Sequence, residues 1–312
     1  MTVLHKPVLV EEILEWLEVR PDGMYADVTV GTGGHTLEIA RRLTTGKVLG
    51  IDRDPQALEI ARERLGPHER QVVLVQAEFS DIGEVAAANH LPGFDGILAD
   101  LGISSLELDT AERGFSFRWA GPLDMRMSPE NPLTADEIVN QWPEKELANL
   151  LYEKAEERDS RRIAKMIVRA RPIRDTEHLA TVVAGGRKAR GRQRLHPATK
   201  TFLALRIAVN REEEALGQFL SRSPVTLNPG GRLIVLSYHS LEDRVVKHEF
   251  QRLAQEGGFK VLTKKIIQPG EAEIQDNPRS RSAKMRVLEK MATAESPAPK
   301  YSRYNDDRIF HN

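Results

Sequence analysis

The sequence predicts an α/β fold in which one parallel β-sheet is interrupted by an inserted helical segment. Three observations carry this prediction. Strand-like and helix-like segments alternate from about residue 24 to residue 102, the chain is then polar and helix-like to about residue 205, and strand-like segments return near residue 230. A chain of 312 residues has room for one large domain that carries a smaller one.

The first half of the sheet is predicted from the order of its segments. A helix is expected over residues 7–17, before a turn at 21–23. Further helices, over 36–43 and 55–65, alternate with strands expected at 24–30, 47–52, 72–77 and 94–102. Because strands that alternate with helices form βαβ units, these strands are expected to run parallel.

The division of the chain follows from where this alternation stops. After Ser105 the sequence is polar and helix-like, and strand-like segments return at residues 230–240, at 259–266 and near 290. We therefore expect the first part of the core at 1–107, an inserted helical domain at 108–205, the second part of the core at 206–291 and a flexible tail at 292–312.

Composition excludes several classes of protein. The chain contains no cysteine, which rules out disulfides, thiolate zinc sites and cysteine nucleophiles and predicts a reducing, cytoplasmic location. No apolar run approaches the length of a membrane span. The first residues carry acids and no long apolar stretch, so neither a secretory signal nor a membrane partner is expected.

Positive charge is concentrated in one part of the chain. The net charge is −1, yet residues 158–206 hold 14 Lys and Arg against three acids. The densest stretch, "RKARGRQR", has no acid and contributes Arg187, Lys188, Arg190, Arg192 and Arg194. A solvated helical face is one interpretation, but a run of a single sign favours contact with a polyanion such as nucleic acid.

A glycine-rich turn follows the first predicted strand. In "DVTVGTGGH" (27–35), Gly31, Gly33 and Gly34 lead into a predicted helix, where glycine permits a tight turn and close approach of a ligand to the backbone. The third glycine of the dinucleotide fingerprint would fall at Thr36, so a pyrophosphate is not expected. A nucleoside without phosphates fits better, and S-adenosylmethionine is the common one. Asp27 could approach the cationic end of such a ligand.

Three residues at the ends of later strands complete the candidate site. Asp52 ends the second strand, 21 residues after Gly31, where a carboxylate can accept hydrogen bonds from ribose hydroxyls. Phe79, after the third strand, could flank an adenine ring or simply pack in the core. Asp100 ends the fourth strand, in the crevice where such sheets bind ligands, although it could instead cap a helix.

Several longer blocks, in order along the chain, carry a resemblance to a known family. They are "DVTVGTGGH", "ADLGISS" (99–105), "ERGFSF" (112–117), "PLDMRM" (122–127), "HPATKTFLALRIAVN" (196–210), "GGRLIVLSYHSLEDRVVK" (230–247) and "NPRSRSAKMR" (277–286). From about residue 4 to 290 the chain resembles the bacterial RsmH (MraW) family. Those proteins use S-adenosylmethionine to methylate N4 of a decoding-centre cytidine in 16S ribosomal RNA of the small ribosomal subunit. The resemblance implies a Rossmann-like class I S-adenosylmethionine-dependent methyltransferase sheet with an inserted helical domain.

The resemblance also implies which residues bind the cofactor. The family's positions carry over to Gly33, Gly34, His35, Asp52, Phe79 and Asp100. Glu107, in "SSLELD", stands where the family commonly has a glutamine that contacts the adenine; a carboxylate can accept from the adenine amine but cannot donate. A second departure is "KAEER" (154–158), where a glycine often precedes Glu-Glu-Arg.

The reaction implied for this family needs a residue that accepts a hydrogen bond from the target amine and a group that accepts its proton. The exocyclic amine of cytosine is a poor nucleophile, and Asp100 can accept a hydrogen bond from it. His239, in "SYHSLEDR", could accept the departing proton or could be a structural residue at a strand end, while Tyr238 could stack on an extruded base. A sulfonium is a strong electrophile, so no metal is expected.

Contacts to RNA are expected from the inserted domain. His196 and Lys200, in "HPATK", could touch the RNA backbone, and Arg206 and Asn210 could brace the site or serve the core. The chain is thus predicted to be an RNA cytosine-N4 methyltransferase. The alternative is a ribosome-assembly RNA-binding protein that keeps the cofactor fold with little catalysis.

Overall fold

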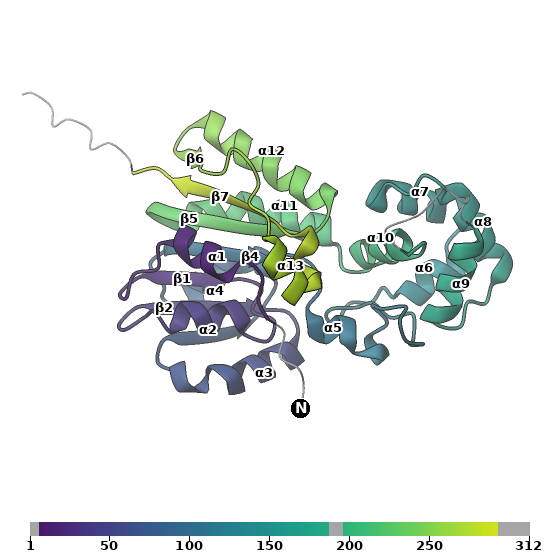
Figure 1. Ribbon diagram of the computed structural model, residues 1–312, viewed down its shortest axis with the longest axis horizontal. Helices are drawn as coiled ribbons and strands as arrows, with labels where there is room; N and C mark the ends of the chain where they lie inside the picture. Colours follow the sequence, from purple (N-terminus) through teal and green to yellow (C-terminus); the bar gives the residue numbers. More distant parts are fainter. Residues whose placement is uncertain (1–5, 187–195, 293–312) are drawn as a thin grey trace, which may run out of the picture.

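The computed structural model describes residues 6–186 and 196–292, and its core is one seven-stranded sheet (Figure 1). The sheet order is β3-β2-β1-β4-β5-β7-β6. The strands are β1 Met24–Asp27, β2 Lys47–Asp52, β3 Val72–Gln76, β4 Phe94–Asp100, β5 Leu227–Ser237, β6 Phe259–Val261 and β7 Lys284–Lys290. The strands from β3 to β5 pair in parallel, whereas β7 is antiparallel to both β5 and β6.

Helices cover both faces of this sheet because successive strand residues point to opposite sides. Ile97 and Ala99 of β4 pack under α4 (Ile82–Ala88), α11 (Glu212–Arg222) and α12 (Ser240–Glu256). Leu98, between them, faces α1 (Val10–Leu17) and α2 (Gly34–Ala40) on the other side. All three side chains are fully buried. Two further helices, α3 (Pro55–Leu65) and the short α13 (Glu271–Asp276), complete the core.

The inserted segment has a hydrophobic core of its own. Its helices are α5 Ser105–Asp109, α6 Ala135–Gln141, α7 Glu144–Ala155, α8 Ser160–Ala170, α9 Thr176–Gly186 and α10 Thr199–Val209. Buried side chains from Phe115 to Val209 form one apolar cluster, separate from those of the sheet. The helices from α6 to α10 therefore lie as a group beside the carboxyl edge of the sheet (Figure 1).

The predicted limit of the insertion at residue 205 falls inside α10. Phe202, Leu205 and Val209 all pack into the helical cluster, so the whole of α10 belongs with it and the chain re-enters the core after Asn210. The Asn210 side chain fixes this exit, since it donates to the Met125 carbonyl at 2.8 Å and accepts from the Met127 amide at 2.8 Å.

Two other expectations concern local structure. The departure from the family at "KAEER" is absorbed by α7, whose last residue is Ala155, while the left-handed position falls on Glu156 at φ 48°. The basic stretch 187–194 and the expected flexible tail from residue 293 lie outside the described residues. Across 6–186 and 196–292, every helix is too short or too polar to cross a membrane.

Two glycines give a stability prediction. Gly114 has φ +72°, and a Cβ there would lie 2.0 Å from the Pro122 carbonyl oxygen. Gly114→Ala should therefore lower the free energy of unfolding by about 2 kcal/mol or more, because the left-handed region alone costs an alanine about 1–2 kcal/mol. Thermal and urea unfolding of the purified chain measure this change.

The matched control is Gly217→Ala. Gly217 is exposed within α11, and a Cβ there meets nothing within 4 Å. This substitution should raise stability by about 0.5–1 kcal/mol through helix propensity. Equal effects of the two substitutions would contradict the constraint assigned to Gly114.

Candidate active site

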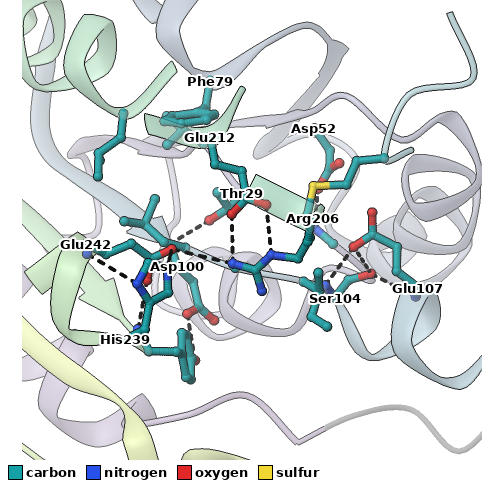
Figure 2. A pocket seen from close by; sticks show the side chains of 18 of the residues that line it. Thr29, Asp52, Phe79, Asp100, Ser104, Glu107, Arg206, Glu212, His239 and Glu242 are labelled. Carbon is teal, nitrogen blue, oxygen red and sulfur yellow. Dashed lines mark hydrogen bonds and ion pairs between the residues drawn. The ribbon is translucent and has the colours of Figure 1, made fainter. Parts of the chain in front are cut away.

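A cavity of about 570 Å³ opens at the carboxyl edge of the sheet (Figure 2). Its walls come from the ends of β1, β2 and β4, from the start of α12, and from α10 and α11 above them. The lining includes Gly31, Gly34, His35, Asp52, Phe79, Asp100, Glu107, Arg206, Glu212, Tyr238, His239 and Glu242. Most of the residues predicted for the cofactor and the chemistry therefore meet in one place.

The glycine turn is held by the carboxylate that ends β2. Asp52 accepts from the Gly31 amide at 2.7 Å and from the Asp54 amide at 2.9 Å. Burial raises the pKa of Asp52 to about 6, although both amide bonds act to lower it. A carboxylate has about four lone-pair positions, so two remain for the hydroxyls of a ribose.

The three glycines have different positions relative to the cavity. Gly31 and Gly34 line it. Gly33, a predicted cofactor residue, is the N-cap of α2 at φ 80° and is not among the lining residues. A Cβ on Gly33 would lie 3.2 Å from Leu65 of α3, so its role is close packing between helices.

Asp27 also lies outside the lining. It is fully buried and accepts from the Thr36 hydroxyl at 2.6 Å and the Thr29 amide at 3.2 Å. These bonds stabilise the start of the glycine turn from within. The expected approach of Asp27 to a cationic ligand is thus not seen.

Asp100, at the end of β4, is held in a defined orientation by its neighbours. Its Oδ1 accepts from the Tyr238 hydroxyl at 2.8 Å, and its Oδ2 lies 3.7 Å from His35 Nδ1. Its backbone amide donates to the Thr29 hydroxyl at 2.7 Å, which fixes the strand end. The side chain is 23% exposed and lines the cavity. One carboxylate oxygen is therefore positioned by tyrosine while the other remains available.

The hydrogen bond from Tyr238 has a definite direction. Burial, followed by the charge of Asp100, raises the pKa of Tyr238 well above its usual value, so the phenol keeps its proton and donates. Burial likewise raises the pKa of Asp100, against the charge of His35 and the bond from Tyr238, which lower it. The predicted stacking of Tyr238 on a base is compatible with its place in the cavity wall.

Glu107 and Phe79 lie in the part of the wall expected to receive an adenine. Glu107 forms a capping box with Ser104 at the start of α5 and lies 3.7 Å from Arg113. Burial raises the pKa of Glu107 to about 7, even though the Ser104 amide lowers it. The Phe79 ring lies tilted against Phe219 with centroids 5.2 Å apart, so it is partly a core residue and partly a cavity wall.

A charged network joins the inserted domain to the core above the cavity. Arg206 of α10 donates two hydrogen bonds of 2.8 Å to Glu212 of α11 and lies 3.8 Å from Glu242 of α12 (Figure 2). Burial acts to lower the pKa of Arg206, but the charges of Glu212 and Glu242 outweigh it and raise that pKa. Glu212 and Glu242 were not predicted as site residues, although the motif "SYHSLEDR" contains the second.

His239 lies in this network as the N-cap of α12. Its Nδ1 accepts from the Glu242 amide at 3.4 Å, and its Nε2 lies 2.9 Å from Glu242 Oε1. Burial acts to raise the pKa of Glu242, yet the bond and charge of His239 together with Arg206 lower it overall. His239 Nδ1 thus has a structural role as a helix cap, while Nε2 lies close to Glu242 Oε1 without forming a hydrogen bond, and proton acceptance by His239 stays a prediction.

His196 and Lys200, which were predicted to touch the RNA backbone, do not line the cavity. The His196 ring stacks on Phe117 with centroids 4.5 Å apart, and its Nδ1 accepts from the Ala198 amide. Lys200 Nζ donates to the Glu156 carbonyl at 2.8 Å, which ties α10 to the end of α7. Arg187, Lys188, Arg190, Arg192 and Arg194 fall outside the described residues.

Fold and cavity together define the class of protein. Dinucleotide-binding sheets are parallel throughout, whereas here β7 enters antiparallel between β5 and β6. This order, with a glycine turn after β1 and carboxylates ending β2 and β4, is that of the Rossmann-like class I methyltransferases. The chain matches the model of the MraW methylase family over residues 2–291 and belongs to that family.

Curated relatives support the same family and align with almost the whole of this chain. A protein of Acidobacterium capsulatum named ribosomal RNA small subunit methyltransferase H is 49% identical over 294 residues, covering 92% of this chain and 98% of the relative. A protein of the same name from a Cyanothece species is 49% identical over 292 residues, covering 94% and 96%. The predicted family, fold class and methyltransferase activity are confirmed.

The buried charge of Glu107 gives a pH prediction. The pKa of Glu107 in the folded chain is about 7, above the ordinary 4.5. The free energy of unfolding is therefore highest below pH 4.5, where Glu107 is protonated in both states, and falls as pH rises through 7. Glu107→Gln keeps the capping box, because glutamine can accept the same bonds. At pH 8 it should raise the free energy of unfolding by up to about 3 kcal/mol, and at pH 4.5 by little.

Thermal unfolding of both proteins across this pH range, without added ligand, measures the difference. Glu112→Gln is the control, since Glu112 is exposed in the next turn of the chain. A Glu107→Gln advantage that is constant with pH would mean that Glu107 does not carry a buried charge.

Proposed function

We propose that this chain transfers a methyl group from S-adenosylmethionine to N4 of a cytidine in the decoding centre of 16S ribosomal RNA. The observation that carries this proposal is Asp100, which ends a central strand and lines the cavity, with Oδ1 fixed by Tyr238 and Oδ2 3.7 Å from His35 Nδ1. The names of the curated relatives support a ribosomal RNA substrate. The substrate is the small ribosomal subunit, and the location is the cytoplasm.

The cavity suits S-adenosylmethionine in its chemistry as well as its size. Asp52 retains two acceptor positions for the ribose, Phe79 offers an apolar face, and Glu107 can accept from the adenine amine. The lining includes six carboxylates against four arginines, an acidic excess that favours a cationic ligand; the carboxylates are Asp52, Asp100, Glu107, Glu212, Glu213 and Glu242. The bound molecule supplies a methyl group on a positively charged sulfur, so no metal is required.

Asp100 can supply what the cytosine amine lacks. The amine lone pair is delocalised into the ring, and a carboxylate that accepts from one N–H draws the amine away from that planar state. Tyr238 keeps the Asp100 carboxylate in one orientation, so the carboxylate is already positioned when the amine enters the cavity. The base must be out of a regular helix to enter, because A-form grooves hide base edges.

The inserted domain carries a surface suited to the RNA backbone. On α8 the exposed positions are Arg161, Arg162, Lys165 and Arg169, opposite the buried Ile163, Ala164 and Ile167. None of the four cations forms an ion pair within the part of the chain that the structure describes. Together with the basic stretch 187–194, this face is the site we assign to phosphate contacts.

The methyl transfer can be tested in cells and with purified components. N4-methylcytidine in 16S ribosomal RNA, measured by mass spectrometry, should disappear in a strain that lacks this gene and return when the gene is restored. Unchanged N4-methylcytidine after deletion would contradict the proposed function. It would leave the alternative of an RNA-binding assembly protein.

Asp100→Asn separates catalysis from binding. The amide keeps the shape of Asp100 but cannot carry a negative charge towards the amine, so methyl transfer should fall by at least about 100-fold. Binding of RNA, measured by filter binding, should change little. Equal losses of binding and transfer would mean that Asp100 is a structural residue.

Charge reversal on α8 tests the RNA-binding face. Lys165→Glu with Arg169→Glu should weaken RNA binding and reduce the slope of log affinity against log salt by about 2. Arg62→Glu, at an exposed position of α3 in the core, is the control. If the α8 variant binds RNA with unchanged affinity and salt dependence, its face is an ordinary solvated surface.

A further inference from the structure

His35 belongs to the glycine turn that is assigned to cofactor binding. That role does not explain the position of its imidazole ring. Its Nε2 lies 2.8 Å from the Val8 carbonyl oxygen, and its Nδ1 faces Asp100 Oδ2 at 3.7 Å. The ring is buried except where it reaches the cavity beside Asp100. It thus bridges the chain segment before α1 and the acidic residue that ends β4.

The bond to Val8 decides where the ring carries its proton. A carbonyl oxygen can only accept, so Nε2 must be the protonated nitrogen of the neutral ring. Nδ1 is then left with a lone pair directed to the side of Asp100. The backbone of Val8 therefore sets the tautomer of His35, as a second hydrogen bond often does for a working histidine.

The carboxylates of Asp27 and Asp100 interact electrostatically with the His35 ring. The charge of His35 acts to lower the pKa of each, although burial raises both pKa values overall. The ionisable groups packed around this region are Asp27, Asp100, Tyr238, Glu242 and Glu273. His35 is thus the basic side chain that interacts with both of the buried acids Asp27 and Asp100.

We propose that His35, acting through Asp100, takes up the proton that the target amine loses. This inference rests on the proposed function. When the amine nitrogen bonds to the methyl carbon, the carbon–sulfur bond breaks and its electron pair stays on sulfur, which leaves the nitrogen positively charged. One N–H proton passes to Asp100 Oδ2 and from there to His35 Nδ1, which becomes the charged imidazolium. After product release the proton returns through Asp100 to water.

The assignment differs from the one expected for His239. His239 Nδ1 already accepts from the Glu242 amide and its Nε2 faces Glu242 Oε1 at 2.9 Å, whereas His35 presents a lone pair to Asp100, which lines the cavity. The separation of 3.7 Å is longer than a hydrogen bond, and catalytic bonds are commonly long before substrate binds. Because Asp100 lines the cavity and its Oδ2 lies 3.7 Å from His35 Nδ1, Asp100 can pass the proton from the amine to His35.

The first test observes His35 directly, without turnover. Nitrogen chemical shifts of ¹⁵N-histidine-labelled protein, assigned with His35→Gln, report tautomer and titration. We expect the neutral ring to be the Nε2–H form, and Asp100→Asn to lower its titration midpoint by about 1 pH unit or more, because a facing negative charge is lost. An Nδ1–H tautomer, or a midpoint that Asp100→Asn leaves unchanged, would overturn the proposal.

The second test measures single-turnover methyl transfer to RNA as a function of pH. In the wild type the rate should rise as His35 loses its proton and then level off. His35→Gln keeps a donor for the Val8 carbonyl but cannot take up a proton, so its rate should be about 100-fold lower and that inflection should vanish. Its affinity for S-adenosylmethionine, measured by calorimetry, should stay within about 2-fold of the wild type, since the substitution changes only the side chain and leaves the backbone of the glycine turn in place.

His239→Gln is the comparison variant, and it should keep the inflection. A wild-type chain that methylates the RNA, with a His35→Gln profile of the same shape and rate, would overturn only the assignment of His35. A wild-type chain that transfers no methyl group to the RNA would contradict the proposed function itself.

Discussion

The parallel register of β2, β1 and β4 is the constraint on which the site depends. Strands of equal direction bring their carboxyl ends to one edge, and this register places Asp52 and Asp100 there together. Burying carboxylates is costly unless donors meet them. The Gly31 amide and the Tyr238 hydroxyl supply such donors, so the same bonds that hold the fold also orient the acids.

The inserted domain adds a second constraint. Its helices have their own apolar core, so they can form a separate surface without disturbing the sheet. The ion pairs of Arg206 with Glu212 and Glu242 connect that domain to the core at the cavity itself. Because these charges are mostly buried, removing one partner would leave the others unpaired in a poorly solvated place. The inserted domain and the cavity are therefore joined through one buried network of charges.

Much of the fold could be predicted from local pattern. β2 and α3 have the expected bounds of 47–52 and 55–65, because β-branched residues and a proline at the first helical turn mark them clearly. β1 ends at Asp27 and not at the expected residue 30. Val28 and Val30 still donate hydrogen bonds to β4 and β2, but the chain has already begun to turn there. α4, α11 and α12 were not predicted. The predicted limit of the insertion, residue 205, falls inside α10, whose apolar residues gave no local sign of which core the helix joins.

The sequence by itself determined which acids would matter, because Asp52 and Asp100 follow strands whose direction the alternation of elements already implies. Only the tertiary structure decided their partners. Tyr238 meets Asp100 across 138 positions, and His35 meets the Val8 carbonyl across 27. Such contacts depend on how helices and strands pack, which no local pattern records. For the same reason His239, which the motif made a candidate base, became a helix cap, and His35 became the histidine beside Asp100.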